Sequence, residues 1–108
     1  LIGDSSYDTA RTNNGLSDCG KKVVLEMNRL GMIVDVSHVD DKTFFDVAEV
    51  SKAPLVATHS SARHFTPGFE RNVSDEIIQK IAEKKGMVMI TFGGSFIDQG
   101  YAAAVDSI

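Results

Sequence analysis

Two histidines hold equivalent positions in the sequence, and their spacing is the first sign of chemistry. His38 and His59 lie 21 residues apart, and each lies just past the end of a short apolar run typical of a buried strand. The carboxyl ends of neighbouring parallel strands lie about 4.8 Å apart at one edge of a sheet, where ligand sites form. The spacing therefore predicts two imidazoles converging on one metal ion, and histidine is the commonest neutral nitrogen ligand for zinc. Alternatively, each histidine only ends a strand and bonds to nearby backbone.

Asp35 is the next candidate, because it lies inside an otherwise apolar run. A carboxylate in such a place is costly unless it is paired. It either orients a metal-bound histidine from behind, or accepts hydrogen bonds from backbone N–H groups near the strand end. The sequence leaves both interpretations open.

Arg71 precedes the third predicted helix, on the side of the sheet where the two histidines are expected. Its planar guanidinium suits a substrate carboxylate or an oxyanion, and the alternative is a solvated loop arginine.

His64 is a weaker candidate for a metal ligand than His38 or His59. Its spacing of five residues from His59 would place the two rings on different faces of a helix, and Pro67 with its neighbours disfavours a helix. We therefore expect His64 to be an exposed loop residue.

Three helices are predicted from apolar residues that recur at helical spacing. Each begins at a polar residue able to cap it, and a Gly or Pro ends it. The predicted helices are residues 17–30, capped by Ser17 and ended by Gly31, a helix capped by Asp40 or Asp41 and stopped before Pro54, and residues 75–85, capped by Ser74. The side chains expected to face inward in the last two are Phe44, Val47, Ala48, Val50, Ile77, Ile78, Ile81 and Ala82.

Three short, nearly continuous apolar runs alternate with these helices and are typical of strands covered on both faces. They span residues 32–36, 55–58 and 87–92, and the four methionines, Met27, Met32, Met87 and Met89, fall at expected core positions. The alternation predicts an α/β fold of consecutive parallel βα units at 17–92, after a loop at 1–16 and before a loop or partial helix at 93–108. Three strands leave two unshielded sheet edges, so further strands or a second chain must cover them.

The composition excludes several classes of protein. The 108 residues carry a net charge of −4, with 43% apolar residues, 24% charged residues and one Cys. These values fit one ordinary domain without a disulfide framework. The sequence also lacks the cluster of basic residues that is typical of a nucleic-acid-binding surface. No apolar run approaches the roughly 18 residues of a membrane span. The compartment is unknown from the sequence, and the cytoplasm and periplasm are the favoured expectations.

Several motifs together resemble the renal, or membrane, dipeptidase family, the M19 zinc peptidases. They are Asn-Arg-Leu-Gly-Met-Ile-Val-Asp-Val-Ser-His-Val at 28–39, Ala-Pro at 53–54, His-Ser-Ser-Ala-Arg at 59–63 and Arg-Asn-Val at 71–73. The resemblance covers about residues 15–92. It implies that residues 1–108 are part of a dipeptidase domain, three consecutive βα units of a (β/α)8 TIM barrel of the metallo-dependent hydrolase type, with an active-site-side segment at 93–108.

The resemblance also implies a function and roles for individual residues. The family hydrolyses dipeptides to free amino acids with two zinc ions (Zn2+) per complete active site, and a hydroxide activated by both metals attacks the substrate. By motif, His38 and His59 bind the second zinc and Arg71 contacts the substrate carboxylate.

The family's other metal ligands, an early His-x-Asp, a bridging Glu and a late Asp, have no counterpart in residues 1–108. No catalytic residue is therefore assigned within this chain, which we expect to be a fragment that is inactive alone, since such a barrel needs about 250 residues. The rest of the barrel, or a second copy in a homodimer, would cover the sheet edges. The alternatives are a non-catalytic ligand-binding barrel segment and an amidohydrolase-like metal hydrolase with a non-peptide substrate.

Overall fold

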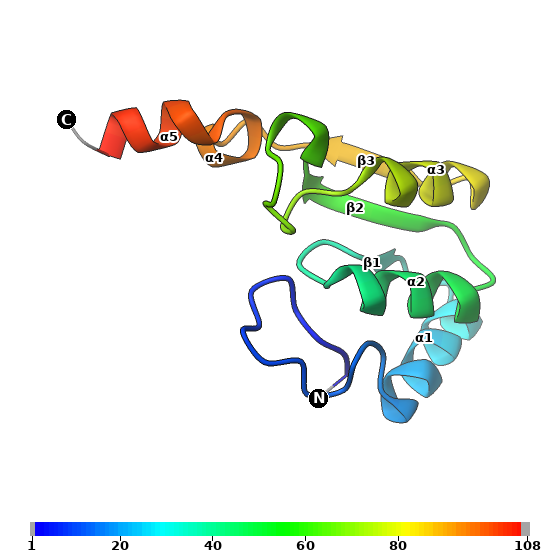
Figure 1. Cartoon of the computed structure of the whole chain (residues 1–108). Helices are drawn as coiled ribbons and strands as arrows, with labels where there is room; N and C mark the ends of the chain where they lie inside the picture. Colours follow the sequence, from blue (N-terminus) through cyan, green and yellow to red (C-terminus); the bar gives the residue numbers. More distant parts are fainter. Residues whose placement is uncertain (1, 107–108) are drawn as a thin grey trace.

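The sheet is parallel, and its three strands lie in sequence order. The computed structural model describes the chain from residue 2 to residue 106. Strand β1 (Val34–Asp35) pairs with β2 (Leu55–Ser60), which pairs with β3 (Met87–Ile90). A helix connects each strand to the next, so the elements form consecutive βα units (Figure 1). The predicted α/β class is confirmed.

The helices begin where the sequence predicts, because a capping side chain precedes each one. The helices are α1 (Asp18–Leu30), α2 (Asp41–Val50) and α3 (Asp75–Glu83). Ser17, Asp40 and Ser74 accept hydrogen bonds from the first-turn amides of Gly20, Thr43 and Ile77, respectively. Gly31 ends α1 with φ of 72°, a conformation that favours glycine. Helix α3 ends at Glu83, two residues before the predicted end.

The core lies between these helices and one face of the sheet. Leu55 and Ala57 are fully buried on the helix-covered face of β2, and Phe44 of α2 and Ile81 of α3 pack there at 1% and 2% exposure. Val50, Ile78 and Met27 are half-buried against the same cluster. Burial alternates along β1 and the start of β2, as expected for strands with one covered face.

The other face of the sheet is open, and this corrects the prediction of strands covered on both faces. Ile33, Met87 and Met89 are between 44% and 69% exposed, and Met32 and Ile90 of the same predicted strands are each 53% exposed. Of the four methionines expected in the core, only Met27 packs against it. The reason is that the described residues supply helices to one face alone. Ala82, expected to face inward, is also exposed, since the buried stripe of α3 is centred on Ile77 and Ile81.

Strand bounds differ from the predictions in a way that matters for the site. β1 contains only two residues of the predicted 32–36, and β3 ends at Ile90 rather than Phe92. β2 instead extends through His59 to Ser60, so His59 is the penultimate residue of the strand rather than a residue beyond it. The strand pairing of β2 with β3 supports this extension, because Ser60 is paired with Ile90.

Loops and short helices complete the described chain. Residues 2–17 contain no helix or strand, but Asp4, 1% exposed, holds them by accepting hydrogen bonds of 3.0 to 3.1 Å from the amides of Thr12, Asn13 and Gly15. A 3-10 turn, η1 (Arg63–Phe65), follows β2. After β3, α4 (Gly94–Ile97) and α5 (Gln99–Asp106) extend away from the sheet (Figure 1). Residues 107 and 108 of the predicted 93–108 segment, and residue 1 of the predicted loop, lie outside the described residues.

Within residues 2–106, no helix has the length and apolar character needed to cross a membrane.

Candidate metal centre

The structure brings His38 and His59 into direct contact. His38 lies in the loop after β1 and His59 near the carboxyl end of β2. Their Nε2 atoms are 2.9 Å apart, with ring centroids at 4.9 Å. Two imidazoles bound tetrahedrally to one zinc at Zn–N distances of about 2.0 to 2.1 Å would place these nitrogens about 3.3 Å apart. The pair therefore fits two ligands of a single ion.

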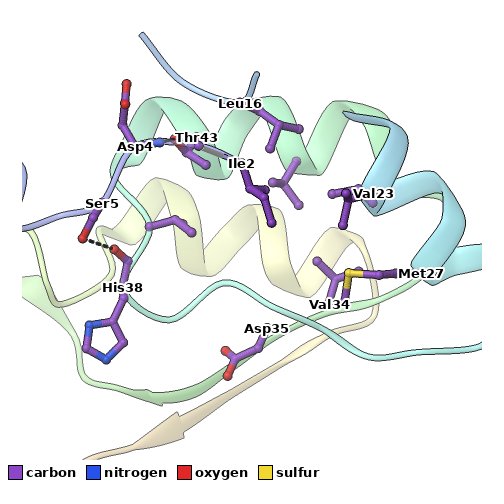
Figure 2. A pocket seen from close by; sticks show the side chains of 14 residues that line it. Ile2, Asp4, Ser5, Leu16, Val23, Met27, Val34, Asp35, His38 and Thr43 are labelled. Carbon is purple, nitrogen blue, oxygen red and sulfur yellow. Dashed lines mark hydrogen bonds between the residues drawn. The ribbon is translucent and has the colours of Figure 1, made fainter. Parts of the chain in front are cut away.

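The N-terminal segment fixes the backbone of His38. The residue has φ of 75°, in the left-handed region that is uncommon for residues other than glycine. Its carbonyl oxygen accepts hydrogen bonds from the Ser6 amide at 2.8 Å and from the Ser5 hydroxyl at 3.1 Å (Figure 2). These two contacts hold the strained backbone in the conformation that directs the His38 ring toward His59.

Asp35 and Thr58 lie behind His59. The Thr58 hydroxyl is 2.6 Å from Asp35 Oδ2 and 2.7 Å from His59 Nδ1. Asp35 Oδ1 also accepts hydrogen bonds from the amides of Ser37 and Thr58, and the Ser37 hydroxyl accepts one from the His59 amide. Asp35 thus accepts backbone N–H groups and is linked to a histidine through Thr58, so the two interpretations left open by the sequence are both consistent with its contacts.

The charges around the pair favour an ionised Asp35 and a neutral His38. Partial burial raises the pKa of Asp35, but the hydrogen bonds from Thr58 and Ser37 outweigh it and leave this pKa below its usual value. Desolvation, then the charge of Arg71 and the neighbouring His59 ring, lower the pKa of His38 against a smaller opposing effect of Asp35. The neutral imidazole is the form that binds metal ions.

Arg71 is buried beside the pair, which excludes the alternative of a solvated loop arginine. It is 3% exposed and donates hydrogen bonds to the Ser60 hydroxyl at 2.8 Å and to the His59 carbonyl at 2.6 Å. Its Cζ lies 5.1 Å from the centroid of the Phe96 ring. Within the described residues its buried Nε has no hydrogen-bond partner. Desolvation lowers the pKa of Arg71, although Tyr7 and Asp35 oppose this.

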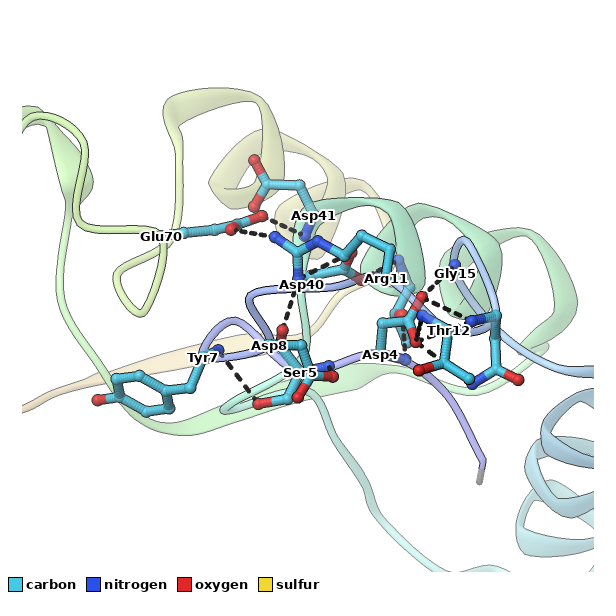
Figure 3. A network of polar contacts seen from close by, with 12 residues as sticks. Asp4, Ser5, Tyr7, Asp8, Arg11, Thr12, Gly15, Asp40, Asp41 and Glu70 are labelled. Atoms are coloured by element: carbon cyan, nitrogen blue, oxygen red, sulfur yellow. Dashed lines mark hydrogen bonds and ion pairs between the residues drawn. The ribbon is translucent and has the colours of Figure 1, made fainter.

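An ion-pair network ties together the loops that carry these residues (Figure 3). Arg11 contacts Glu70 at 2.6 Å, and Glu70 accepts a hydrogen bond from the amide of Asp41 at the start of α2. Arg63, from the sequence motif after β2, makes two hydrogen bonds to Asp41 at 2.6 and 2.7 Å and donates to the carbonyl of Asn72. These ion pairs and hydrogen bonds therefore link the segment around His38 to the segment around Arg71.

An apolar cavity of about 310 Å³ adjoins the site. Residues of the N-terminal segment, α1, β1 and α2 line it, and Asp35 and His38 contribute to its wall (Figure 2).

Two residues near the histidine pair, Thr58 and Tyr7, were not predicted from the sequence. The ring centroid of Tyr7 lies 6.0 Å from that of His38. Adjacency to His59 was an available signal for Thr58. No signal pointed to Tyr7, because loop folding alone places it.

Two further observations limit the site. As expected, His64 is exposed, and it lies in η1 with its ring against Phe65 rather than against the histidine pair. Residues 2–106 contain no group of three or more His, Cys, Asp or Glu side chains arranged to hold a metal ion. The described part of the chain therefore offers two adjacent imidazoles and not a complete set of metal ligands.

Comparison with known proteins finds dipeptidases, both in the family model that matches this chain and among its relatives. The model of the family described as membrane dipeptidase, peptidase family M19, matches residues 2–108. Dipeptidase tcpJ of Claviceps purpurea is 44% identical over 92 residues, covering 85% of this chain and 21% of its own length. An uncharacterized dipeptidase of Schizosaccharomyces pombe is 43% identical over 97 residues, covering 90% of this chain and 24% of its own. The chain thus spans less than a quarter of the length of these relatives.

Solved structures extend the similarity to the fold. A metallo peptidase from Rhodobacter sphaeroides, liganded with a phosphinate mimic of the dipeptide L-Ala-D-Ala, has a TM-score of 0.77 and 41% identity, over 92% of this chain and 26% of that one. An amidohydrolase from Pseudomonas aeruginosa has a TM-score of 0.81 and 34% identity, over 99% of this chain and 34% of that one. These similarities confirm the predicted fold, in which the βα units are part of a metallo-dependent hydrolase barrel. The chain belongs to the membrane dipeptidase family, peptidase family M19.

Proposed function

We propose that the full-length protein is a zinc-dependent dipeptidase that cleaves dipeptides into free amino acids at a two-zinc centre, and that this chain supplies His38 and His59 to one of the two ions. The observation that carries the proposal is the 2.9 Å contact between the two Nε2 atoms in a chain of the M19 family. The remaining ligands come from parts of the polypeptide outside this chain.

The donor set fits zinc. Imidazole nitrogen is a common zinc ligand, whereas magnesium and calcium prefer oxygen. Desolvation of His38 and the nearby positive charge of Arg71 lower the pKa of that ring and so favour its neutral, ligating form. When bound, a pair of zinc ions supplies an activated water and polarises the scissile carbonyl of a substrate.

The residues of this chain then have distinct tasks. His38 and His59 hold the metal, His38 through a backbone fixed by the N-terminal segment. Arg71 orients the substrate by its C-terminal carboxylate, since its guanidinium is adjacent to His59 and its Nε has no partner in the described chain. Asp35 supports His59 from behind. None of these residues transfers a proton to the substrate in this proposal.

A dipeptide is the substrate class that the relatives favour. The Rhodobacter sphaeroides relative was solved with a phosphinate mimic of L-Ala-D-Ala, and Arg71 offers this chain a partner for the free carboxylate of such a molecule. The second candidate is a metal hydrolase with a non-peptide substrate. It is supported by the amidohydrolase from Pseudomonas aeruginosa, which matches 99% of this chain.

The proposed function must also explain what covers the open face and the unpaired edges of the sheet. We assign them to the remaining strands of the barrel, because apolar residues such as Ile33 and Met87 would point into its interior. Contact with a second copy of the chain in a homodimer is the alternative. The mass of the native full-length protein in solution separates the two.

Zinc content and dipeptide turnover, measured together on the purified full-length protein, test the proposed function. We expect two zinc ions per polypeptide and hydrolysis of dipeptides that is lost on chelation and restored by added zinc. Two zinc ions without turnover of any dipeptide in a broad panel would favour the non-peptide hydrolase. Absence of bound zinc after zinc supplementation would favour a non-catalytic ligand-binding segment.

A further inference from the structure

Three side chains form a continuous hydrogen-bonded chain behind His59. Asp35 Oδ2 is 2.6 Å from Thr58 Oγ1, which is 2.7 Å from His59 Nδ1. Asp35 comes from β1, whereas Thr58 and His59 are consecutive residues of β2. The parallel pairing of the two strands brings them together.

The direction of each hydrogen bond follows from the donors available. Asp35 receives the amides of Ser37 and Thr58 on Oδ1, at 2.9 and 3.2 Å, and N–H groups can only donate. A carboxylate with such neighbours acts as an acceptor, so the single Thr58 hydroxyl proton points to Asp35 Oδ2. The Thr58 oxygen then faces His59 with a lone pair, and the hydrogen between them must belong to Nδ1.

A hydrogen on Nδ1 of His59 determines the state of Nε2, on the opposite side of the ring. A neutral imidazole with its hydrogen on Nδ1 carries a lone pair on Nε2, the atom that faces His38 Nε2 at 2.9 Å. Without metal, the hydrogen in that contact then belongs to His38 Nε2, which donates to His59 Nε2. The opposite tautomer would direct the Nε2 hydrogen at the place where a metal ion must sit. It would also set lone pairs of Nδ1 and the Thr58 oxygen against each other.

We propose that Thr58 is a positioning residue, whose hydroxyl relays Asp35 to His59 and holds His59 in the Nδ1–H tautomer with Nε2 free for metal. The proposal rests on the proposed role of His59 as a zinc ligand. It assigns the orienting function to the pair of Asp35 and Thr58 rather than to Asp35 alone. Hydroxyl-bearing Ser37 completes the support, because it accepts the His59 amide and so fixes the backbone as well as the ring.

The tautomer is read directly in full-length protein stripped of metal and labelled with ¹⁵N-histidine, at a pH where His59 is neutral. The ¹⁵N shifts and couplings of its ring, assigned by their loss in His59→Gln, distinguish the two nitrogens. We expect Nδ1 to carry the hydrogen. An Nε2–H tautomer in the unaltered protein overturns the proposal, whatever any variant does, and the measurement does not depend on whether the protein binds zinc.

Variants at position 58 test the hydroxyl. Thr58→Val keeps the shape and strand preference of threonine and removes the hydroxyl, which donates to Asp35 and accepts from His59, whereas Thr58→Ser keeps the hydroxyl. We expect Thr58→Val to mix the tautomers and to weaken zinc binding about 10- to 100-fold, as loss of a ligand's supporting hydrogen bond does elsewhere, and Thr58→Ser to restore both to near the original values.

Thr91→Val is the matched control, because Thr91 contacts Ser61 through its backbone and lies after β3, away from the relay. It should change neither the tautomer nor the zinc affinity. Unaltered tautomer and affinity in a folded Thr58→Val protein would contradict the relay. A normal Nδ1–H tautomer in a protein that binds no zinc would refute the proposed function while leaving the relay intact.

Discussion

Replacing His38 or His59 with alanine in the full-length protein is expected to abolish dipeptide hydrolysis and the binding of one zinc ion. Each change removes one of two facing nitrogens. We expect kcat/KM to fall by more than about 100-fold, the upper end of what the loss of a ligand's supporting group costs. Zinc content by atomic emission should fall from two ions toward one per polypeptide.

His64→Ala is the matched control for this prediction. His64 is the third histidine of the chain, and it is exposed in η1 against Phe65. Its replacement should leave zinc content and turnover unchanged. Full zinc content and turnover in a folded His38→Ala protein would remove that residue from the metal site. An equal loss in His64→Ala would indicate a general effect of losing a histidine instead.

Replacing Arg71 with alanine is expected to weaken selectively the use of substrates with a free C-terminal carboxylate. A hydrogen bond to a charged group contributes about 1.5 to 3 kcal/mol, which corresponds to roughly a 10- to 150-fold change. We expect this change mainly in KM for dipeptides. Kinetics on matched dipeptides and dipeptide amides check it, because the amide lacks the negative charge that Arg71 would bind.

The comparison of substrates matters because Arg71 also supports the protein. It donates to Ser60 and to the carbonyl of His59, so its loss will disturb the site to some extent for every substrate. An equal loss for acid and amide would mean that Arg71 acts only through these contacts. Arg29→Ala, on the exposed surface of α1 and paired with Glu26, should affect neither substrate.

Features of the fold that depend on nearby residues were predictable from the sequence. The caps Ser17, Asp40 and Ser74 act on amides three residues away. The sequence predicts Ser17 and Ser74 directly and Asp40 as one of two candidates, beside Asp41. The meeting of His38 and His59 was predictable for a different reason. It follows from the same position in two successive βα units, which parallel pairing converts into proximity.

Features that depend on distant residues were not predictable. The apolar runs at 32–36 and 87–92 indicate strands buried on both faces, but burial of the second face requires residues that the described part of the chain, 2–106, does not supply. Arg71 is buried partly because Phe96, from α4, lies against its guanidinium. The relay through Thr58 depends on the register of β1 against β2, which apolar patterning alone does not determine.

Anomalous diffraction at the zinc edge, from crystals of the full-length protein prepared with zinc, tests the central claim most directly. The claim is that His38 and His59 together bind one ion of a two-zinc centre. We predict an anomalous peak about 2.0 to 2.1 Å from both Nε2 atoms, and a second peak about 3.5 to 4 Å from the first. Zinc peaks elsewhere in the crystal, with His38 and His59 still in contact and no metal between them, would contradict the claim.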